Sequence, residues 1–241
     1  MLRIFGTLLA TAILFSSSPI RAQEEMNISV DGAVDTYSQY IWRGYNLGNK
    51  VAMQPSLTLG FGESGMSLNI WGSASMMDRS EPKNLKDFDE LDFTLSYDRT
   101  LSEESGVGIS LGYIQYTFPS VAKGTHSEEF YAGLSLDNAA APSLTAYYDF
   151  GLADAWYITF GIGPEFALGS EGNTSLGIGA SVGMSNGTGS AAFNDVTFSA
   201  SLGIPAGAFT ISPVLGFSYA DKKVNPDESE AWGGLSISFS K

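Results

Sequence analysis

The chain has 241 residues, of which 26 are acidic and 12 are basic, giving a formal net charge of −14. This balance excludes a protein that binds nucleic acid by neutralising phosphates, because such binding needs clustered Lys and Arg. The chain contains no cysteine, which excludes disulfides and thiolate metal sites, and its length suits one domain of barrel or sandwich type.

The N-terminus has the organisation of a secretory signal peptide. Arg3 supplies a positive charge, residues 4–15 are mostly apolar, and cleavage is expected after Ala22. The apolar stretch is shorter than the roughly 20 residues that a membrane helix needs. We therefore expect residues 1–22 to be a signal peptide and residues 23–241 to form the exported domain. In that domain 10 basic residues stand against 26 acidic ones, a net charge of −16.

From residue 26 onward, apolar and polar residues alternate, which is the pattern of β-strands with two unlike faces. Leu176, Ile178 and Val182, for example, alternate with Gly and Ser residues. Most segments approach the length of a tilted membrane strand, about 9–11 residues, and exceed the roughly five or six of a typical soluble strand. We predict twelve strands, at 26–37, 51–62, 66–77, 88–100, 107–118, 128–136, 143–150, 154–168, 174–185, 194–203, 208–220 and 230–241.

Short turns alternate with longer polar links along most of the chain. The short turns are expected at 63–65, 102–106, 169–173 and 205–207, and the long links at 38–50, 78–87, 119–127, 186–193 and 221–229, with 151–153 as a short exception. Bacterial barrels place short turns and both termini in the periplasm. We therefore predict an all-β fold, a transmembrane antiparallel up-and-down β-barrel of about 12 strands, in the outer membrane of a Gram-negative bacterium.

Alternation alone also fits a soluble sandwich, in which the apolar face would be the core. Aromatic residues near strand ends can separate the two folds, because membrane barrels carry aromatic girdles at both interfaces. They favour the membrane barrel here. The predicted girdle residues are Tyr40, Trp42, Tyr97, Tyr116, Trp156 and Trp232.

Two neighbouring segments go beyond generic barrel patterning. They are Asp35-Thr36-Tyr37-Ser38-Gln39-Tyr40-Ile41-Trp42-Arg43-Gly44-Tyr45 and Gln54-Pro55-Ser56-Leu57. Together they resemble the outer-membrane porin family labelled TorF-like, and the MltA-interacting outer-membrane barrel proteins are similar in size. The first resemblance implies a barrel and a channel, and it implies no catalytic residues.

If the first predicted strand continues through this segment, Asp35, Gln39 and Arg43 share the inward face, and Tyr40 and Trp42 point outward. A bulge in the segment would reverse these faces. An arginine in a confined interior needs carboxylate partners, which it binds through two parallel hydrogen bonds. Two roles therefore stay open for Arg43: it pins the first link to the wall, or it takes part in selecting solutes.

The polar faces of the strands would line the barrel interior. Acidic residues there would favour cations, as rings of Asp and Glu do in channels, while the Gly and Ser residues of 174–185 and 194–203 would leave space. We expect a passive channel for small hydrophilic solutes with weak cation preference, whose partners are outer-membrane lipid and those solutes. The alternative is a non-conducting structural or adhesion barrel whose extracellular loops bind a partner. The predicted pore-lining residues are Asp35, Arg43, Glu90, Asp92, Asp98, Glu129 and Asp149.

Two groups of residues invite a chemical role, and neither has the spacing for one. The single histidine, His126, precedes Ser127, but adjacent strand residues point to opposite faces and cannot pair as base and nucleophile. The acidic residues between 87 and 92 spread over both faces and lack the spacing of a calcium loop. We predict no enzyme activity, no metal site and no cofactor.

Overall fold

The computed structural model describes residues 27–48, 50–76, 88–121, 125–169 and 173–241. The predicted signal peptide at 1–22 and the predicted link at 78–87, with its acidic residue 87, lie outside these ranges. Within the described ranges, no helix is long and apolar enough to cross a membrane.

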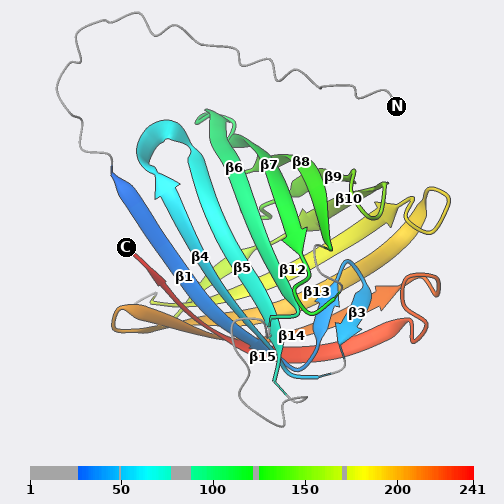
Figure 1. The fold of residues 1–241 in the computed structure, drawn as a ribbon. Helices are drawn as coiled ribbons and strands as arrows, with labels where there is room; N and C mark the ends of the chain where they lie inside the picture. The colour runs from blue at the N-terminus through cyan, green and yellow to red at the C-terminus, as the bar shows by residue number, and fades with distance from the viewer. Residues whose placement is uncertain (1–26, 49, 77–87, 122–124, 170–172) are drawn as a thin grey trace, which may run out of the picture.

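In the described residues, twelve antiparallel wall strands form a closed barrel (Figure 1). Each strand pairs with the next along the chain, and the pairing of β1 with β15 closes the wall. This confirms the predicted all-β barrel and its strand number. The wall strands are β1 (Ile28–Tyr37), β4 (Ala52–Phe61), β5 (Met66–Ser75), β6 (Glu90–Ser102), β7 (Val107–Thr117), β8 (His126–Leu136), β9 (Ser143–Asp149), β10 (Ala155–Ile162) with β11 (Glu165–Leu168), β12 (Thr174–Ser185), β13 (Ala192–Ala206), β14 (Phe209–Ala220) and β15 (Ser229–Ser240).

Strands β10 and β11 are successive parts of one wall strand. β10 ends at Ile162 and β11 begins at Glu165, and both pair with β12 in one register. Pro164 lies between them and has no backbone N–H, while its carbonyl accepts a hydrogen bond from the Ile178 amide at 3.0 Å. The predicted strand at 154–168 therefore corresponds to both parts.

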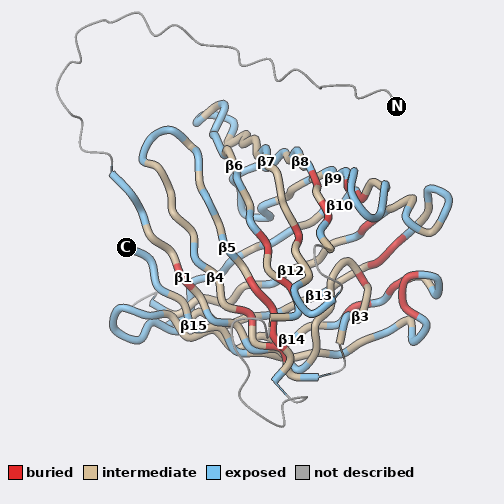
Figure 2. Tube along the Cα trace, in the orientation of Figure 1, coloured by how far each residue is buried: buried red, intermediate tan, exposed pale blue. Residues whose placement is uncertain are grey.

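The two faces of the wall are reversed relative to a soluble protein. Phe93, Leu95 and Ile178 are 42%, 44% and 45% exposed on the outside, whereas Glu129 and Asp149 are buried inside. Figure 2 shows most of the buried residues toward the end of the barrel that carries β3. A soluble sandwich would bury its apolar residues instead, so that alternative does not describe this fold.

The connections fall at two ends of the barrel, as their lengths predict. The single-turn helix η1 (Gly62–Ser64) joins β4 to β5, and Gly207 with Ala208 joins β13 to β14. The long link between β1 and β4 lies at the opposite end. The start of β1 and the C-terminal Lys241 lie at the short-turn end, where the Lys241 amide donates to the Val30 carbonyl at 3.0 Å.

A separate two-stranded sheet lies within the link between β1 and β4. Its strands are β2 (Tyr40–Trp42) and β3 (Tyr45–Gly48). Arg43 and Gly44 form the turn with φ angles of 48° and 78°, the left-handed values that a tight two-residue hairpin needs. The first wall strand therefore ends before this hairpin, in agreement with the predicted strand at 26–37. The continuation on which the faces of Gln39, Tyr40, Trp42 and Arg43 are conditional does not occur.

Candidate functional site in the barrel interior

Residues 40–48, the interior hairpin, lie inside the barrel. The Arg43 guanidinium donates to Glu129 on β8, and the Arg43 carbonyl accepts a hydrogen bond from Asn194 on β13 at 2.7 Å. β8 and β13 are not neighbours in the wall. A segment that contacts both strands must therefore lie within the space that the wall encloses.

Arg43 is enclosed by one carboxylate and three aromatic rings, which form the guanidinium cage. Its Nη1 and Nη2 donate to Oε2 and Oε1 of Glu129 at 2.8 and 2.7 Å, a bidentate pair. The guanidinium carbon lies 4.5, 4.3 and 4.6 Å from the ring centroids of Trp42, Tyr147 and Tyr157, within cation–π range. Burial lowers the pKa of Arg43, but its hydrogen bonds with Glu129 outweigh that effect and raise it. The guanidinium therefore stays charged.

Gly44 allows the turn to approach the wall closely. A Cβ at this position would lie 2.7 Å from Cβ of Asp195 and 2.8 Å from Cβ of Ala220. Its φ of 78° also disfavours any L side chain. Arg43 itself has a φ unusual for a residue other than glycine, and its contacts with the wall hold it there.

Tyr40 and Asn46 attach the two arms of the interior hairpin to other strands. The ring of Tyr40 lies 5.7 Å from that of Trp71 on β5, and Asn46 Nδ2 donates to Glu230 Oε1 on β15 at 2.9 Å. Burial chiefly, with the neighbouring Glu90 carboxylate, raises the pKa of Tyr40, so its hydroxyl stays protonated. The hairpin is thus fixed on several sides of the interior.

Four of the six predicted girdle residues lie inside the barrel, so the girdle prediction is wrong for them. Tyr40 and Trp42 turn inward with the interior hairpin, where Trp42 packs on Tyr116 with ring centroids 6.0 Å apart. Trp232 also faces inward, and its Nε1 donates to the Ser218 hydroxyl at 3.2 Å. Proximity to a strand end does not fix the face to which a side chain belongs. The two girdle residues on the outward face are Tyr97 and Trp156.

Other buried carboxylates of the interior bind neutral donors. Asp149 accepts a hydrogen bond from the Ser127 hydroxyl at 2.7 Å. Asp195 accepts hydrogen bonds from the Tyr157 hydroxyl at 3.0 Å and from Asn194 Nδ2 at 2.9 Å. These donors carry no charge, so none of them neutralises a carboxylate as Arg43 does for Glu129.

The structure brings together only part of the predicted pore-lining set. The positions are Arg43 in the interior hairpin, Asp35 on β1, Glu90, Asp92 and Asp98 on β6, Glu129 on β8 and Asp149 on β9. Asp149 is the cross-strand neighbour of Glu129, whereas Asp98 lies beside the short turn at Gly65, far from the cage. Oδ1 of Asp35 and of Asp92 is buried without a hydrogen-bond partner among the described residues. That these residues line a conducting pore stays a prediction.

Sequence reasoning missed four residues of this site: Tyr157, Asn194, Asp195 and Glu230. Asp195 and Glu230 lie near the ends of predicted strands and share the inward face, so following the alternation to each strand end would have found them. Tyr157 shares the inward face of the predicted strand 154–168 in the same way. Asn194 carries no such signal, because it lies where the register between β12 and β13 shifts.

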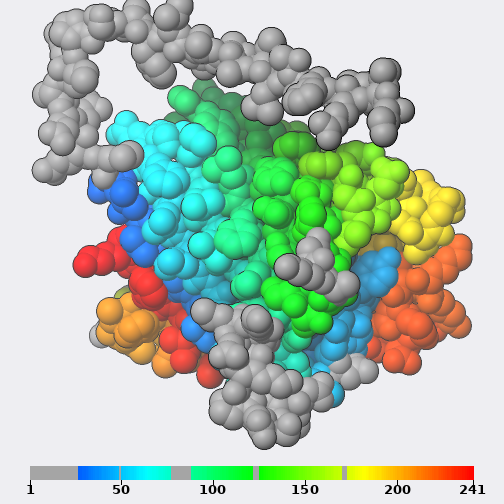
Figure 3. All heavy atoms as spheres, in the orientation of Figure 1, coloured from blue at the N-terminus to red at the C-terminus, as the bar shows by residue number. Residues whose placement is uncertain are grey.

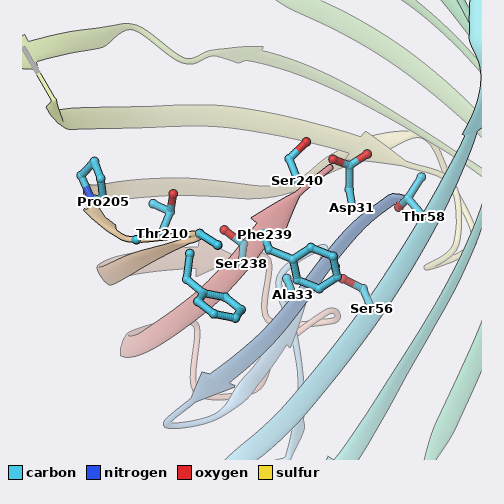
Figure 4. Close-up of a pocket in the computed structure, with 13 residues that line it drawn as sticks. Asp31, Ala33, Ser56, Thr58, Pro205, Thr210, Ser238, Phe239 and Ser240 are labelled. Atoms are coloured by element: carbon cyan, nitrogen blue, oxygen red, sulfur yellow. The ribbon is translucent and has the colours of Figure 1, made fainter. Parts of the chain in front are cut away.

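Cavities lie on both sides of the interior hairpin. One of about 360 Å³ is lined by Arg43, Glu129 and Tyr157, with Ala153 and Gly187 from the loop end of the barrel. Figure 3 shows that side chains fill the spaces between neighbouring strands on the face in view. A second cavity, of about 500 Å³, lies at the short-turn end, and its polar lining residues are Asp31, Ser56, Thr58, Thr210, Ser238 and Ser240 (Figure 4).

His126 and Ser127 point to opposite faces, as the alternation predicts. The Ser127 hydroxyl is buried and donates to Asp149, whereas His126 Nε2 lies 3.2 Å from Glu128 Oε1 and is half exposed. They do not form a base–nucleophile pair. Across the part of the chain that the structure describes, no group of three or more His, Asp or Glu side chains is arranged to hold a metal ion.

Comparisons with known proteins agree with a barrel of this kind. A family model described as "Bacterial protein of unknown function (Gcw_chp)" matches residues 21–231. No curated protein matches the sequence. The family model carries neither of the two family names expected from the sequence, so that narrower resemblance stays a prediction.

Solved structures with a similar fold include two of a KdgM porin. One covers 88% of this chain and 98% of its own, with a TM-score of 0.56 and 10% identity. The other, in complex with disordered oligogalacturonate, covers 88% and 97%, with a TM-score of 0.54 and 10% identity. An outer membrane channel from Pseudomonas putida F1 has a TM-score of 0.48 at 12% identity, covering 95% of this chain and 100% of its own. At such identities, the two KdgM porin structures establish the likeness of fold alone.

Proposed function

This chain belongs to the bacterial family of unknown function Gcw_chp, and we propose that it is an outer-membrane channel for the passive diffusion of small hydrophilic solutes. One observation carries the proposal. A closed wall with an apolar exterior surrounds a polar interior that contains cavities on both sides of a single hairpin. No catalytic role is assigned to any residue of this interior.

The outer membrane of a Gram-negative bacterium is the location that fits this wall. In lipid every backbone polar group needs a partner, and closure of the sheet leaves no unpaired edge around the barrel. The exposed apolar side chains of the outer face would contact lipid. The predicted signal peptide at 1–22 supports export, and the likeness of fold to the KdgM porin supports a porin-like barrel.

A weak preference for cations follows from the charges of the interior. Asp149 and Asp195 bind neutral donors, and Arg43 is neutralised by Glu129. A confined interior of low dielectric focuses the remaining negative field. The KdgM porin has been seen with oligogalacturonate, an acidic sugar chain, and the acidic interior disfavours such a polyanion in this protein.

The alternative is a non-conducting structural barrel whose outer loops bind a partner. One observation favours it: the interior hairpin is held by a bidentate ion pair and by hydrogen bonds to β13 and β15. A hairpin fixed in this way narrows the interior. A channel function requires that the space beside the interior hairpin still admits hydrated ions.

Planar-bilayer recording of the purified, folded protein tests both functions. We expect a conductance whose reversal potential under a salt gradient has the sign of a cation preference. That preference should weaken at high salt, because the Debye length falls to about 3 Å at 1 M. Folded protein that never conducts would support the structural barrel, and an anion preference would keep the channel but reject the role of the acidic interior.

A further inference from the structure

We propose that the guanidinium cage is a binding site for guanidinium groups in general, which the chain's own Arg43 occupies in this structure. Solutes that carry a guanidinium group would take the site by displacing the Arg43 side chain. Only the passage of such solutes rests on the proposed channel; binding itself does not. The ligand class is therefore a flat, delocalised organic cation.

The arrangement of the cage selects this class of cation. Glu129 presents both of its oxygens to the two terminal nitrogens of one planar group, at 2.7 and 2.8 Å. An ammonium group is a compact point charge and does not match this fork. The rings of Trp42, Tyr147 and Tyr157 add three aromatic faces within 4.6 Å of the guanidinium carbon, which favours a stacked cation.

Most of the cage is held by the wall and does not depend on the Arg43 side chain. The Tyr116 hydroxyl donates to Glu129 Oε1 at 2.8 Å and orients the carboxylate. The Tyr157 hydroxyl donates to Asp195 at 3.0 Å, and the ring of Tyr147 lies 6.1 Å from that of Tyr157. Loss of the arginine side chain would therefore leave these groups in place around an empty space.

The hairpin backbone also has anchors besides the Arg43 side chain. Asn194 donates to the Arg43 carbonyl at 2.7 Å, a bond that any residue at this position can accept. Asn46 donates to Glu230 on β15, and Trp42 packs edge-on against Tyr116. Replacement of the side chain should therefore keep Trp42, the fourth wall of the cage, in position.

The cage can be reached from the loop end of the barrel. Arg43, Glu129 and Tyr157 line the cavity of about 360 Å³ that extends to the loop end, where Ala153 and Gly187 lie. A small cation entering from that end would meet the exposed edge of the cage. A tethered side chain competes at an effective concentration of the order of mM or more, so a free ligand needs a comparable concentration in the unaltered protein.

The test is a binding titration of the folded full chain with the substitution Arg43→Ala. Methylguanidinium is added, with methylammonium as the probe of equal charge, and the fluorescence of the tryptophans is followed because Trp42 lines the cage. Without the arginine, buried Glu129 lacks a cation, which drives ligand binding. We expect methylguanidinium to bind at least about tenfold more tightly than methylammonium, as charge-assisted bidentate bonding requires.

Two further variants give the controls. Arg99→Ala removes an exposed arginine outside the cage. Because it keeps Arg43, it should bind methylguanidinium only at the higher concentrations, of the order of mM or more, that displacement of the tethered side chain requires. Glu129→Gln combined with Arg43→Ala should weaken methylguanidinium binding by about tenfold or more. Equal affinity of Arg43→Ala for the two probes, or the same binding by Arg99→Ala, would overturn the proposal.

Refolding provides a second measurement if Arg43→Ala folds poorly. Millimolar methylguanidinium should restore the yield of the folded, heat-modifiable form, and methylammonium should not; equal or absent restoration would contradict the site.

Bilayer recording separates the site from the channel. Guanidinium binding by a protein that never conducts keeps the site and removes the channel, whereas a conducting protein whose Arg43→Ala variant does not bind methylguanidinium keeps the channel and removes the site.

Discussion

At the scale of single residues, Arg43 and Glu129 carry the organisation of the interior. The Arg43 side chain is 14% exposed and that of its carboxylate partner Glu129 only 1%. Each buried charge is therefore compensated by the opposite charge of its partner. A buried pair of this kind contributes little net stability when intact, because desolvation offsets attraction. The loss of one partner is far more damaging, since it leaves an uncompensated charge.

We therefore predict that Glu129→Gln lowers the free energy of unfolding by about 3–5 kcal/mol. Glu128→Gln is the matched control, because Glu128 is the adjacent residue on the opposite face and lies near the half-exposed His126. Its effect should be within about 1 kcal/mol. Denaturant unfolding in detergent micelles measures both. Similar losses for the two variants would mean that the ion pair with Arg43 does not hold the hairpin.

Gly44 offers a second test at this scale. Gly44→Ala introduces a Cβ that overlaps Asp195 and Ala220, in addition to the strain of a φ of 78°. Gly207→Ala is the control, since Gly207 has a φ of 68° but no atom within 4 Å of its Cβ. The control should cost about 1–2 kcal/mol from backbone strain, and Gly44→Ala about 1–3 kcal/mol more from overpacking. Equal losses in denaturant unfolding would show that the hairpin is not pressed against β13 and β14.

At the scale of elements, the interior hairpin is the feature that turns a plain barrel into a narrowed one. It departs from the wall after Tyr37 and returns at Ala52, and these two residues still pair across β1 and β4. The wall can therefore close without the hairpin. The hairpin adds an obstruction to the interior and leaves the sheet intact.

Replacement of residues 39–50 by a short Gly–Ser link should accordingly give a folded barrel with a conductance several-fold higher. The physical reason is that Trp42 and Arg43 no longer occupy the barrel interior, which leaves more space for ions. Single-channel recording measures the change. Shortening of 188–190, in a link at the same end of the barrel, keeps the cavity-lining Gly187; it is the control and should leave conductance nearly unchanged. An unaltered conductance in the hairpin variant would place the constriction elsewhere.

The sequence predicted the wall much better than the hairpin, for a physical reason. A wall strand has two unlike environments, so period-two alternation records it directly, as in Leu176, Ile178 and Val182. The hairpin contains no such contrast, because both of its faces contact protein. Its turn, Arg43-Gly44, also lacks the Asn-Gly or Asp-Gly pair that most strongly signals a tight hairpin. The predicted end of the first strand at residue 37 agrees with β1, but the alternation does not indicate the hairpin that follows, and the cage could not be assembled from sequence.

At the scale of the whole molecule, the reversed distribution of polar and apolar residues is the dominant property. The outer face carries Leu95 and its apolar neighbours, and the inner face carries Ser96, whose hydroxyl lies 2.7 Å from that of Ser67. Two adjacent residues thus belong to opposite environments. The same substitution at each of them should therefore have opposite consequences.

Leu95→Arg should cost about 2–4 kcal/mol if the residue lies near the bilayer midplane, and it should impair assembly. Ser96→Arg should still give a folded barrel and should lower the cation preference, because it adds a positive charge to the interior. Heat-modifiability on gels reports folding, and reversal potentials report selectivity. Impaired assembly in both variants would argue against the assignment of the two faces to lipid and interior.

The long sequence separations within the cage also have a consequence for the order of folding. Arg43 binds Glu129, 86 residues away, and Asn194, 151 residues away. Contacts of such long range form slowly, because loop-closure entropy opposes them until much of the chain is in place. The interior hairpin can dock only after β8 and β13 have both joined the sheet. Its docking should therefore be a late kinetic phase of barrel maturation, with Trp42 as its natural reporter.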